Sequence, residues 1–216
     1  MYTFTMRIIK LNEIDSTHRY LKDYIKNNSF SQTLCIQTDN QTNGIGSRGN
    51  SWQGTKGNLF FSFVISKNDL PNDLPIQSAS IYFSYLLKQV LKENKSNVWL
   101  KWPNDFYISD KKIGGTITTI SNDLIYCGIG LNLISVSEDF GKLDININSN
   151  KILELYFDKL ERKYSWKQVF SDFKIEFENS KKYQASIDNQ KVSLENAILN
   201  EDGSIEVNNK KVFSLR

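Results

Sequence analysis

Residues 98–133, which read VWLKWPNDFYISDKKIGGTITTISNDLIYCGIGLNL, decide the fold. Short apolar segments rich in β-branched residues alternate there with polar turn signals, at Asp110-Lys111 and again at residues 121–123. Tight turns of this kind join neighbouring strands that run in opposite directions. The stretch therefore predicts a strand at 98–102, followed by an antiparallel meander from 105 to 133.

The segments on either side supply helices and further strands. Apolar runs upstream predict strands at 3–11, 33–38 and 59–66, and helical spacing of apolar residues predicts helices at 16–27 and 75–94. Downstream, we expect helices at 150–162 and 165–179 and strands at 191–199 and 204–215. The whole predicts an α+β fold, a mostly antiparallel sheet with helices on one face, followed by a small C-terminal β appendage.

Length and composition are those of an ordinary globular protein. The chain has 216 residues, 39% hydrophobic and 24% charged, and its formal net charge of +3 is spread along the sequence. No concentrated basic face, typical of nucleic-acid binding, is indicated. The N-terminal residues lack the apolar core of a signal peptide, and no stretch approaches the roughly 20 apolar residues of a membrane span. We therefore expect a cytoplasmic protein without membrane attachment.

Cysteine and histidine are too few for a typical metal site. Cys35 and Cys127 are the only cysteines, and both lie in apolar, strand-like stretches without metal-site spacing. His18 is the only histidine. We expect two buried, reduced thiols and no metal held directly by protein side chains.

A glycine-studded loop at 39–57 is the first candidate binding segment. Residues 41–52 carry three glycines, which free backbone amides to approach an anion. Arg48 adds a fork of donors for phosphate, and Trp52 a flat face for a ring. The loop matches neither a Walker loop nor a dinucleotide fingerprint, and an ordinary surface turn is the alternative.

A dense group of functional side chains follows the strand at 98–102. Lys101-Trp102-Pro103-Asn104-Asp105 combines a cation, an aromatic ring, a rigid turn, an amide and a carboxylate. Further on, Lys112 begins an apolar strand beside two glycines, whose missing side chains leave room for a ligand. The alternatives are a plain turn with a buried tryptophan and a solvated lysine at a strand start.

Two further segments could let a ligand approach the backbone. Gly128-Ile129-Gly130-Leu131-Asn132 has glycines inside a strand, which a β-bulge would explain equally well. Ser16-Thr17-His18 opens the first helix, where free amides and hydroxyls can bind a polar head group. Helix capping is the alternative for these three residues.

In order and spacing these segments resemble the motifs of the biotin protein ligases, from about residue 16 to 132 and more weakly to the end. That family has Ser-Thr-Asn at a helix start, a Gln-x-x-Gly-Arg-Gly-x-x-Gly-x-x-Trp loop, and the patterns Lys-Trp-Pro-Asn-Asp, Lys-x-x-Gly and Gly-x-Gly-x-Asn. The resemblance implies the fold shared by class II synthetases and biotin/lipoate ligases. It implies a catalytic domain at 1–180 and a trimmed, SH3-like β domain at 181–216.

The resemblance also implies a reaction and a role for each matched residue. Biotin would be activated with ATP and Mg²⁺ to biotinyl-5′-AMP and transferred to a lysine of a biotin carboxyl carrier protein, such as that of acetyl-CoA carboxylase. Lys112 would hold the carboxylate and α-phosphate, and Asp105 would orient or deprotonate the acceptor lysine. Arg48 would stabilise negative charge, and Lys101 would balance the leaving AMP. The implied substrate-binding residues are Ser16, Thr17 and Gln41 at the ureido head, with His18, Gly44, Ile45, Gly46, Ser47, Trp52, Asn104, Gly115, Gly128, Gly130 and Asn132.

The sequence departs from the family pattern at two places. Ile45 and Ser47 stand where the loop usually carries arginines, so Arg48 is the only cation there. This predicts looser retention of the adenylate and less selective labelling of lysines. His18 replaces the asparagine of the first motif and changes the hydrogen-bonding groups at the pocket mouth.

Partners and alternatives follow from the same resemblance. Many bacterial relatives carry an N-terminal DNA-binding domain, but here the ligase signature begins by Ser16, so we predict no sequence-specific DNA binding. A homodimer is left open. The competing interpretations are a lipoate or octanoate ligase or transferase of the same superfamily, and a catalytically silent biotin-binding protein. A nucleic-acid-binding module is least favoured, because the lysines are scattered.

Overall fold

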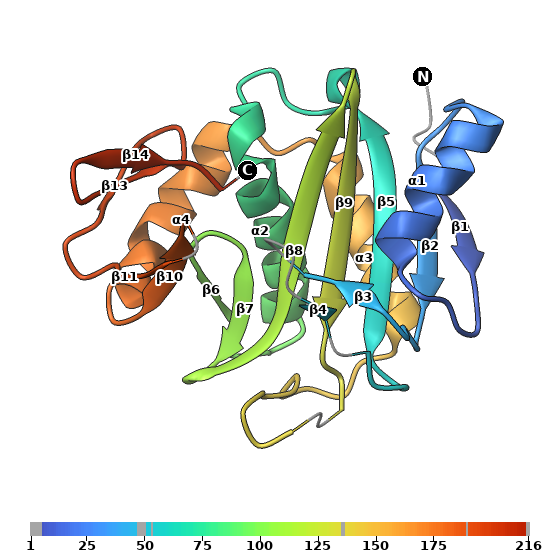
Figure 1. Ribbon diagram of the computed structural model, residues 1–216, viewed down its shortest axis with the longest axis horizontal. Coiled ribbons are helices and arrows are strands. Elements are labelled where there is room, and N and C mark those ends of the chain that lie inside the picture. Colours follow the sequence, from blue (N-terminus) through green and yellow to red (C-terminus); the bar gives the residue numbers. More distant parts are fainter. Residues whose placement is uncertain (1–5, 47–50, 53, 135–136, 189, 215–216) are drawn as a thin grey trace.

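The meander predicted from residues 98–133 is confirmed. A computed structural model describes residues 6–46, 51–52, 54–134, 137–188 and 190–214 (Figure 1). The meander consists of β6 (Trp99–Lys101), β7 (Asp105–Ile108), β8 (Lys111–Ser121) and β9 (Leu124–Leu131), each antiparallel to the next. Ser109 and Asn122 take up positive φ angles of 51° and 52° in two of the turns. Small polar residues tolerate this left-handed conformation, so both turns can be tight.

Three upstream strands complete a seven-stranded sheet. They are β1 (Arg7–Lys10), β2 (Leu34–Thr38) and β5 (Leu59–Ser66). The strand order is β1-β2-β5-β9-β8-β7-β6. Only the β1–β2 pair of this sheet is parallel, because α1 (Thr17–Asn28) carries the chain back between them. The predicted α+β fold with a mostly antiparallel sheet is therefore confirmed.

Helices α2 (Ala79–Glu93) and α3 (Ser149–Glu161) cover one face of the sheet, behind it in Figure 1. Phe63 of β5 meets Phe83 of α2 and Tyr156 of α3, with ring centroids 5.1 Å and 5.8 Å apart. Two short 3-10 helices, η2 (Lys67–Asp69) and η3 (Ile76–Ser78), precede α2. Helix α4 (Trp166–Ser180) packs beside β6 at the sheet edge.

Helix α1 lies on the opposite face, in front of the sheet in Figure 1. Its buried Leu21 and Ile25 pack in one cluster with Ile36 and Val64. These strand residues alternate with others that face α2 and α3, because successive side chains of a strand point to opposite faces. The prediction that helices cover only one face is therefore wrong, because helices pack against both faces. The N-terminus of α1 lies on the face opposite to α2 and α3.

The C-terminal β segment is more finely divided than predicted. It forms a hairpin, β10 (Gln184–Ile187) with β11 (Gln190–Ser193), and a small sheet of β12 (Ile198–Leu199), β13 (Ile205–Val207) and β14 (Lys210–Val212). The strand predicted at 204–215 is split at Asn208 and Asn209, which have positive φ angles of 51° and 58°. Two such residues in succession are typical of a tight hairpin turn. A separate domain at 181–216 stays a prediction.

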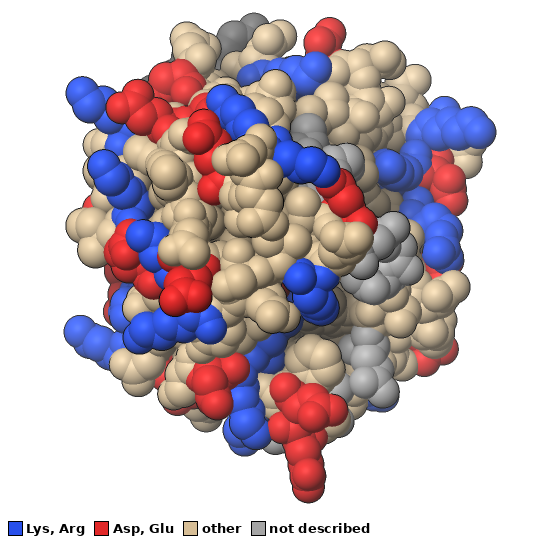
Figure 2. Space-filling view, turned by 60° about the vertical axis from the view of Figure 1, so that its left-hand side comes forward, with Lys and Arg blue, Asp and Glu red and all other residues tan. Residues whose placement is uncertain are grey.

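Charged side chains on the face shown in Figure 2 are mixed, with basic and acidic groups interspersed. No helix among the described residues is long and apolar enough to cross a membrane.

Candidate active site

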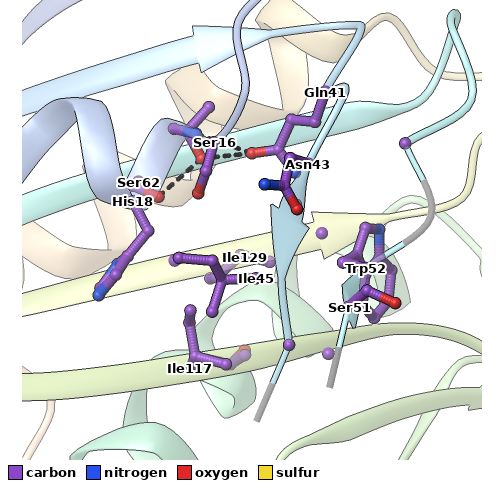
Figure 3. Close-up of a pocket in the computed structure, with 18 of the residues that line it drawn as sticks. Ser16, His18, Gln41, Asn43, Ile45, Ser51, Trp52, Ser62, Ile117 and Ile129 are labelled. Carbon is purple, nitrogen blue, oxygen red and sulfur yellow. Dashed lines mark hydrogen bonds between the residues drawn. The ribbon is translucent and has the colours of Figure 1, made fainter. Parts of the chain in front are cut away.

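A cavity of about 830 Å³ opens on the α1 side of the sheet, between the start of α1, β8, β9 and the loop at 39–57 (Figure 3). Most predicted site residues line it: Ser16, Thr17, His18, Gln41, Gly44, Ile45, Gly46, Trp52, Asn104, Asp105, Lys112, Gly115, Gly128, Gly130 and Asn132. Lys101 stands outside the lining but contacts Asp105. Ser47 and Arg48 lie outside the described residues. Segments more than 100 residues apart in sequence thus meet in one site.

A buried hydrogen-bond network forms one end of the cavity. The backbone N–H and the hydroxyl of Thr17 both donate to Gln41 Oε1, over 2.8 Å and 3.0 Å. The Thr17 hydroxyl therefore accepts from Ser62 Oγ, 2.8 Å away. Ser16 caps the helix by accepting from the backbone N–H of Arg19. Because its oxygen is occupied by Thr17, Gln41 turns its amide nitrogen toward Gly44.

His18 follows on the first turn of α1. Its Nε2 lies 3.3 Å from Thr119 Oγ1, whereas Nδ1 is buried and has no hydrogen-bond partner among the described residues. Burial, with a smaller contribution from Lys22, lowers the pKa of His18 to about 4. The imidazole of His18 is therefore neutral at pH 7.

The burial of His18 predicts an acid-sensitive fold. Unfolded His18 takes up a proton near its ordinary pKa of 6.5, but folded His18 only near 4. Between these values the unfolded state binds more protons, so the free energy of unfolding falls as the pH is lowered, by about 3 kcal/mol for this group. In His18→Asn this part of the loss is expected to vanish. Urea unfolding of both proteins at pH 7 and pH 4 measures it, and equal pH dependence would contradict the assignment.

The loop at 39–57 contains a short hairpin, which the sequence did not predict. Its strands are β3 (Gly44–Ile45) and β4 (Ser51–Trp52). The hairpin sets the Trp52 indole on Gly130, where an added Cβ would lie only 2.8 Å from Trp52 Cε2. Lys112 Nζ lies 5.6 Å from the centre of the same ring. The space left by Gly130 is thus taken by a side chain of the protein itself.

Asp105 and Lys112 line the other end of the cavity, where Lys101 also contacts Asp105. The carboxylate oxygens of Asp105 lie 2.6 Å from Lys112 Nζ and 3.4 Å from Lys101 Nζ. Burial alone would raise the pKa of Asp105, but the two ammonium groups hold it below its ordinary value. Burial also lowers the pKa of Lys101, and Asp105 opposes that shift only in part. The group is a mostly buried carboxylate shared between two cations.

A β-bulge aims Lys112 into the cavity. The register between β7 and β8 shifts at Phe106 and Tyr107, which pair with Gly114 and Lys112. Ile113 and Gly114 consequently both face the core, since Ile113 is buried there and a Cβ on Gly114 would meet Phe106. Lys112 and Gly115 are left on the cavity side. Strand β9 pairs in continuous register with both of its neighbours, so the bulge considered as an explanation for its glycines is absent from it. The bulge of this meander lies in β8.

Comparison with known proteins identifies the family. The profile of the biotin/lipoate A/B protein ligase family matches residues 11–132. The chain belongs to this family. The resemblance drawn from the five motifs is confirmed.

Relatives of this ligase family member include longer proteins and a solved structure that matches over nearly the whole chain. Biotin–protein ligase 2 of Arabidopsis thaliana is 30% identical over 169 residues, covering 68% of this chain and 50% of that protein. The bifunctional ligase/repressor BirA of Escherichia coli (strain K12) is 31% identical over 127 residues, covering 56% and 38%. The chain thus spans half or less of these curated relatives. The crystal structure of biotin acetyl coenzyme A carboxylase synthetase from Helicobacter pylori with bound biotinylated ATP is 40% identical, with a TM-score of 0.92, over 97% of this chain and 100% of that one.

Several cavity residues of this ligase family member were missed. They include Ser62, Thr116, Ile117, Ile129 and Phe140. Ser62 could have been found from the sequence, because it is a hydroxyl residue inside the apolar run that forms β5. Thr116 is held through the backbone, because its N–H donates to the carbonyl of Asn104 over 3.0 Å while the Asn104 amide donates to the carbonyl of Thr116. Phe140 gave no signal, since it follows β9 in an irregular segment.

Proposed function

We propose that this protein is a biotin protein ligase, which activates biotin with ATP to biotinyl-5′-AMP and transfers it to a lysine of a biotin carboxyl carrier protein. The observation that carries the proposal is that one cavity has uncharged hydrogen-bonding groups at one end and charged groups at the other. One end holds the network of Thr17, Gln41 and Ser62, and the other holds Asp105 with its two lysines. The similarity to the Helicobacter pylori synthetase supports it.

The network end suits the head group of biotin. A ureido group carries two N–H donors and a carbonyl acceptor, which match the hydroxyl and amide groups of Ser16, Thr17 and Gln41. The dithiolane ring of lipoate has no such groups and would leave buried polar atoms unpaired, a strong basis for rejection. The cavity therefore favours biotin over lipoate or octanoate.

The lysine end suits the first reaction step. A carboxylate oxygen of biotin attacks the α-phosphorus of ATP, and pyrophosphate leaves with the bonding electrons. Negative charge grows on the α-phosphate as the bond forms, so a fixed ammonium group stabilises the transition state more than the bound reactants. Lys112 is the residue we assign to this role, and Arg48 stays a predicted second cation.

The same end suits the transfer step. The amine of the carrier lysine must be neutral to attack the acyl carbon, after which AMP leaves and the nitrogen loses a proton. Asp105 is ionised at neutral pH and can orient the amine and accept that proton. Lys101, 3.4 Å from Asp105, would balance the charge of AMP.

ATP and the carrier complete the proposal. Mg²⁺ would enter bound to the phosphate oxygens of ATP, since oxygen atoms are its preferred ligands. Among the described residues no group of three or more His, Cys, Asp or Glu lies close enough together to hold a metal ion. A carboxylase subunit, such as that of acetyl-CoA carboxylase in the cytoplasm, is the carrier we propose.

Pyrophosphate exchange tests the proposed function. With purified protein, ATP and Mg²⁺, label from pyrophosphate is expected to enter ATP when biotin is present and to stay at background with lipoate. This outcome follows from the polar network of Thr17 and Gln41, because a ureido group has hydrogen-bonding groups to offer it and a dithiolane ring has none. Exchange with lipoate alone would indicate that the protein is a lipoate ligase. Exchange with neither acid would indicate a catalytically silent binding protein.

A further inference from the structure

The turn between β12 and β13 accepts hydrogen bonds from three side chains that precede the C-terminal β segment in the chain. The carbonyl oxygens of residues 201, 202 and 203 accept hydrogen bonds from Trp166 Nε1 at 2.8 Å, Ser78 Oγ at 2.5 Å and Trp102 Nε1 at 3.1 Å. Three consecutive backbone acceptors are thus matched by donors that come from three different segments. The turn is thus one attachment of the C-terminal β unit, which comprises β10 to β14, to the rest of the chain; buried apolar side chains such as Ile205 and a hydrogen bond from Ser214 Oγ to the carbonyl of Gln77 are others.

The turn has little freedom to move. Gly203 has a φ of +81°, and an added Cβ would lie 2.6 Å from Ser78 Oγ and 3.0 Å from Trp166 Cη2. Its N–H also donates to the carbonyl of Asn200 over 2.9 Å. Only glycine fits such a position, so the carbonyl of Gly203 is a fixed acceptor.

Trp102 links this fixed turn to the candidate active site. The side chain is fully buried, and its backbone N–H donates over 2.9 Å to Ser180 Oγ at the end of α4. Asn104 and Asp105, which line the cavity, follow two and three residues later, at the end of the turn and the start of β7. Trp102 is therefore anchored from both sides by residues 78 and 101 positions away in sequence.

We infer that Trp102 is a positioning residue of the ligase reaction, and that the C-terminal β unit serves catalysis by holding its indole N–H at Gly203. The inference rests on the proposed function. Asp105 must keep its oxygens at 2.6 Å and 3.4 Å from two ammonium groups, and a shift of the preceding backbone would change both distances. Displacements of about 1 Å are enough to reduce rates about a hundredfold.

Two matched variants separate positioning from mere docking. Trp102→Phe and Trp166→Phe each remove one indole N–H from the same turn and leave an aromatic ring in a buried site. Only Trp102 lies in the chain segment that carries Asp105, and Trp166 does not line the cavity. We expect both variants to melt a few degrees earlier. In biotin-dependent exchange, Trp102→Phe should lose about tenfold in kcat with little change in KM for biotin, while Trp166→Phe keeps the kcat of the unmodified protein.

Other outcomes would overturn the inference. Equal losses of kcat in the two variants, or none in Trp102→Phe, would make the turn a docking contact only. If Trp102→Phe does not fold, Ser180→Ala decides the question, because it removes the acceptor of the Trp102 backbone N–H; an unchanged kcat in Ser180→Ala would reject the positioning role. Absence of biotin-dependent exchange in the unmodified protein would instead refute the proposed function itself.

Discussion

Replacing Lys112 with methionine is expected to reduce biotin-dependent pyrophosphate exchange by about 10²–10³-fold, while biotin binding weakens far less. Removal of a single preorganised donor to a developing negative charge typically has an effect of this size. Methionine keeps an unbranched side chain beside Gly115 and Trp52, so the bulge and the hairpin should persist. Isotope exchange measures the rate, and calorimetry with biotin measures the affinity.

Lys111 provides a matched control for this variant. It precedes Lys112 in β8, but it points away from the cavity, is exposed, and donates to the carbonyl of Glu138 over 2.8 Å. Lys111→Met therefore removes the same charge from the same strand and should leave exchange unchanged. Comparable losses in both variants would mean that net charge matters and that Lys112 has no specific role. Full exchange in Lys112→Met would remove it from the first step.

Much of the fold could be predicted because local patterns and tertiary packing agree there. Tight polar turns between β-branched runs required antiparallel neighbours, and β6 to β9 have that arrangement. The side of the sheet on which α1 packs could not be predicted in this way. It depends on Ile36 and Val64 facing one way and Cys35 and Phe63 the other, and both faces of β2 and β5 are apolar. A strand buried on both faces carries no sign of which helix covers which face.

The candidate site was predicted as a set of segments, but not as a geometry. Glycines at 115, 128 and 130 were interpreted as space for a ligand, yet Gly130 receives the Trp52 indole. The bulge in β8, which turns Lys112 toward Asp105, leaves no trace in composition because Ile113 and Gly114 look like ordinary strand residues. The roles of Trp102 and Ser62 depend on partners far away in sequence, which no local spacing encodes.

Replacing Asp105 with asparagine is expected to slow transfer to the carrier lysine by about 10²–10⁴-fold, and to slow exchange less. Loss of a general base has effects of this size, and an amide cannot accept the proton of the attacking amine. The neighbouring ammonium groups keep the pKa of Asp105 below its ordinary value, so the carboxylate is available at all pH values near neutrality. In Asp105→Asn the pKa of the buried Lys101 should fall further, because in the unmodified protein the Asp105 carboxylate opposes that decrease.

Single-turnover transfer from preformed biotinyl-5′-AMP isolates this step from adenylation. Asp110→Asn removes an exposed carboxylate from the turn between β7 and β8 and should transfer at the normal rate. Hydroxylamine, a small amine that is largely neutral at pH 7, should still trap the adenylate in Asp105→Asn, because it needs no base. Loss of lysine transfer with retained hydroxamate formation assigns Asp105 to the amine. Equal loss of transfer, trapping and exchange would show that the carboxylate acts only by holding Lys112, 2.6 Å away, in place.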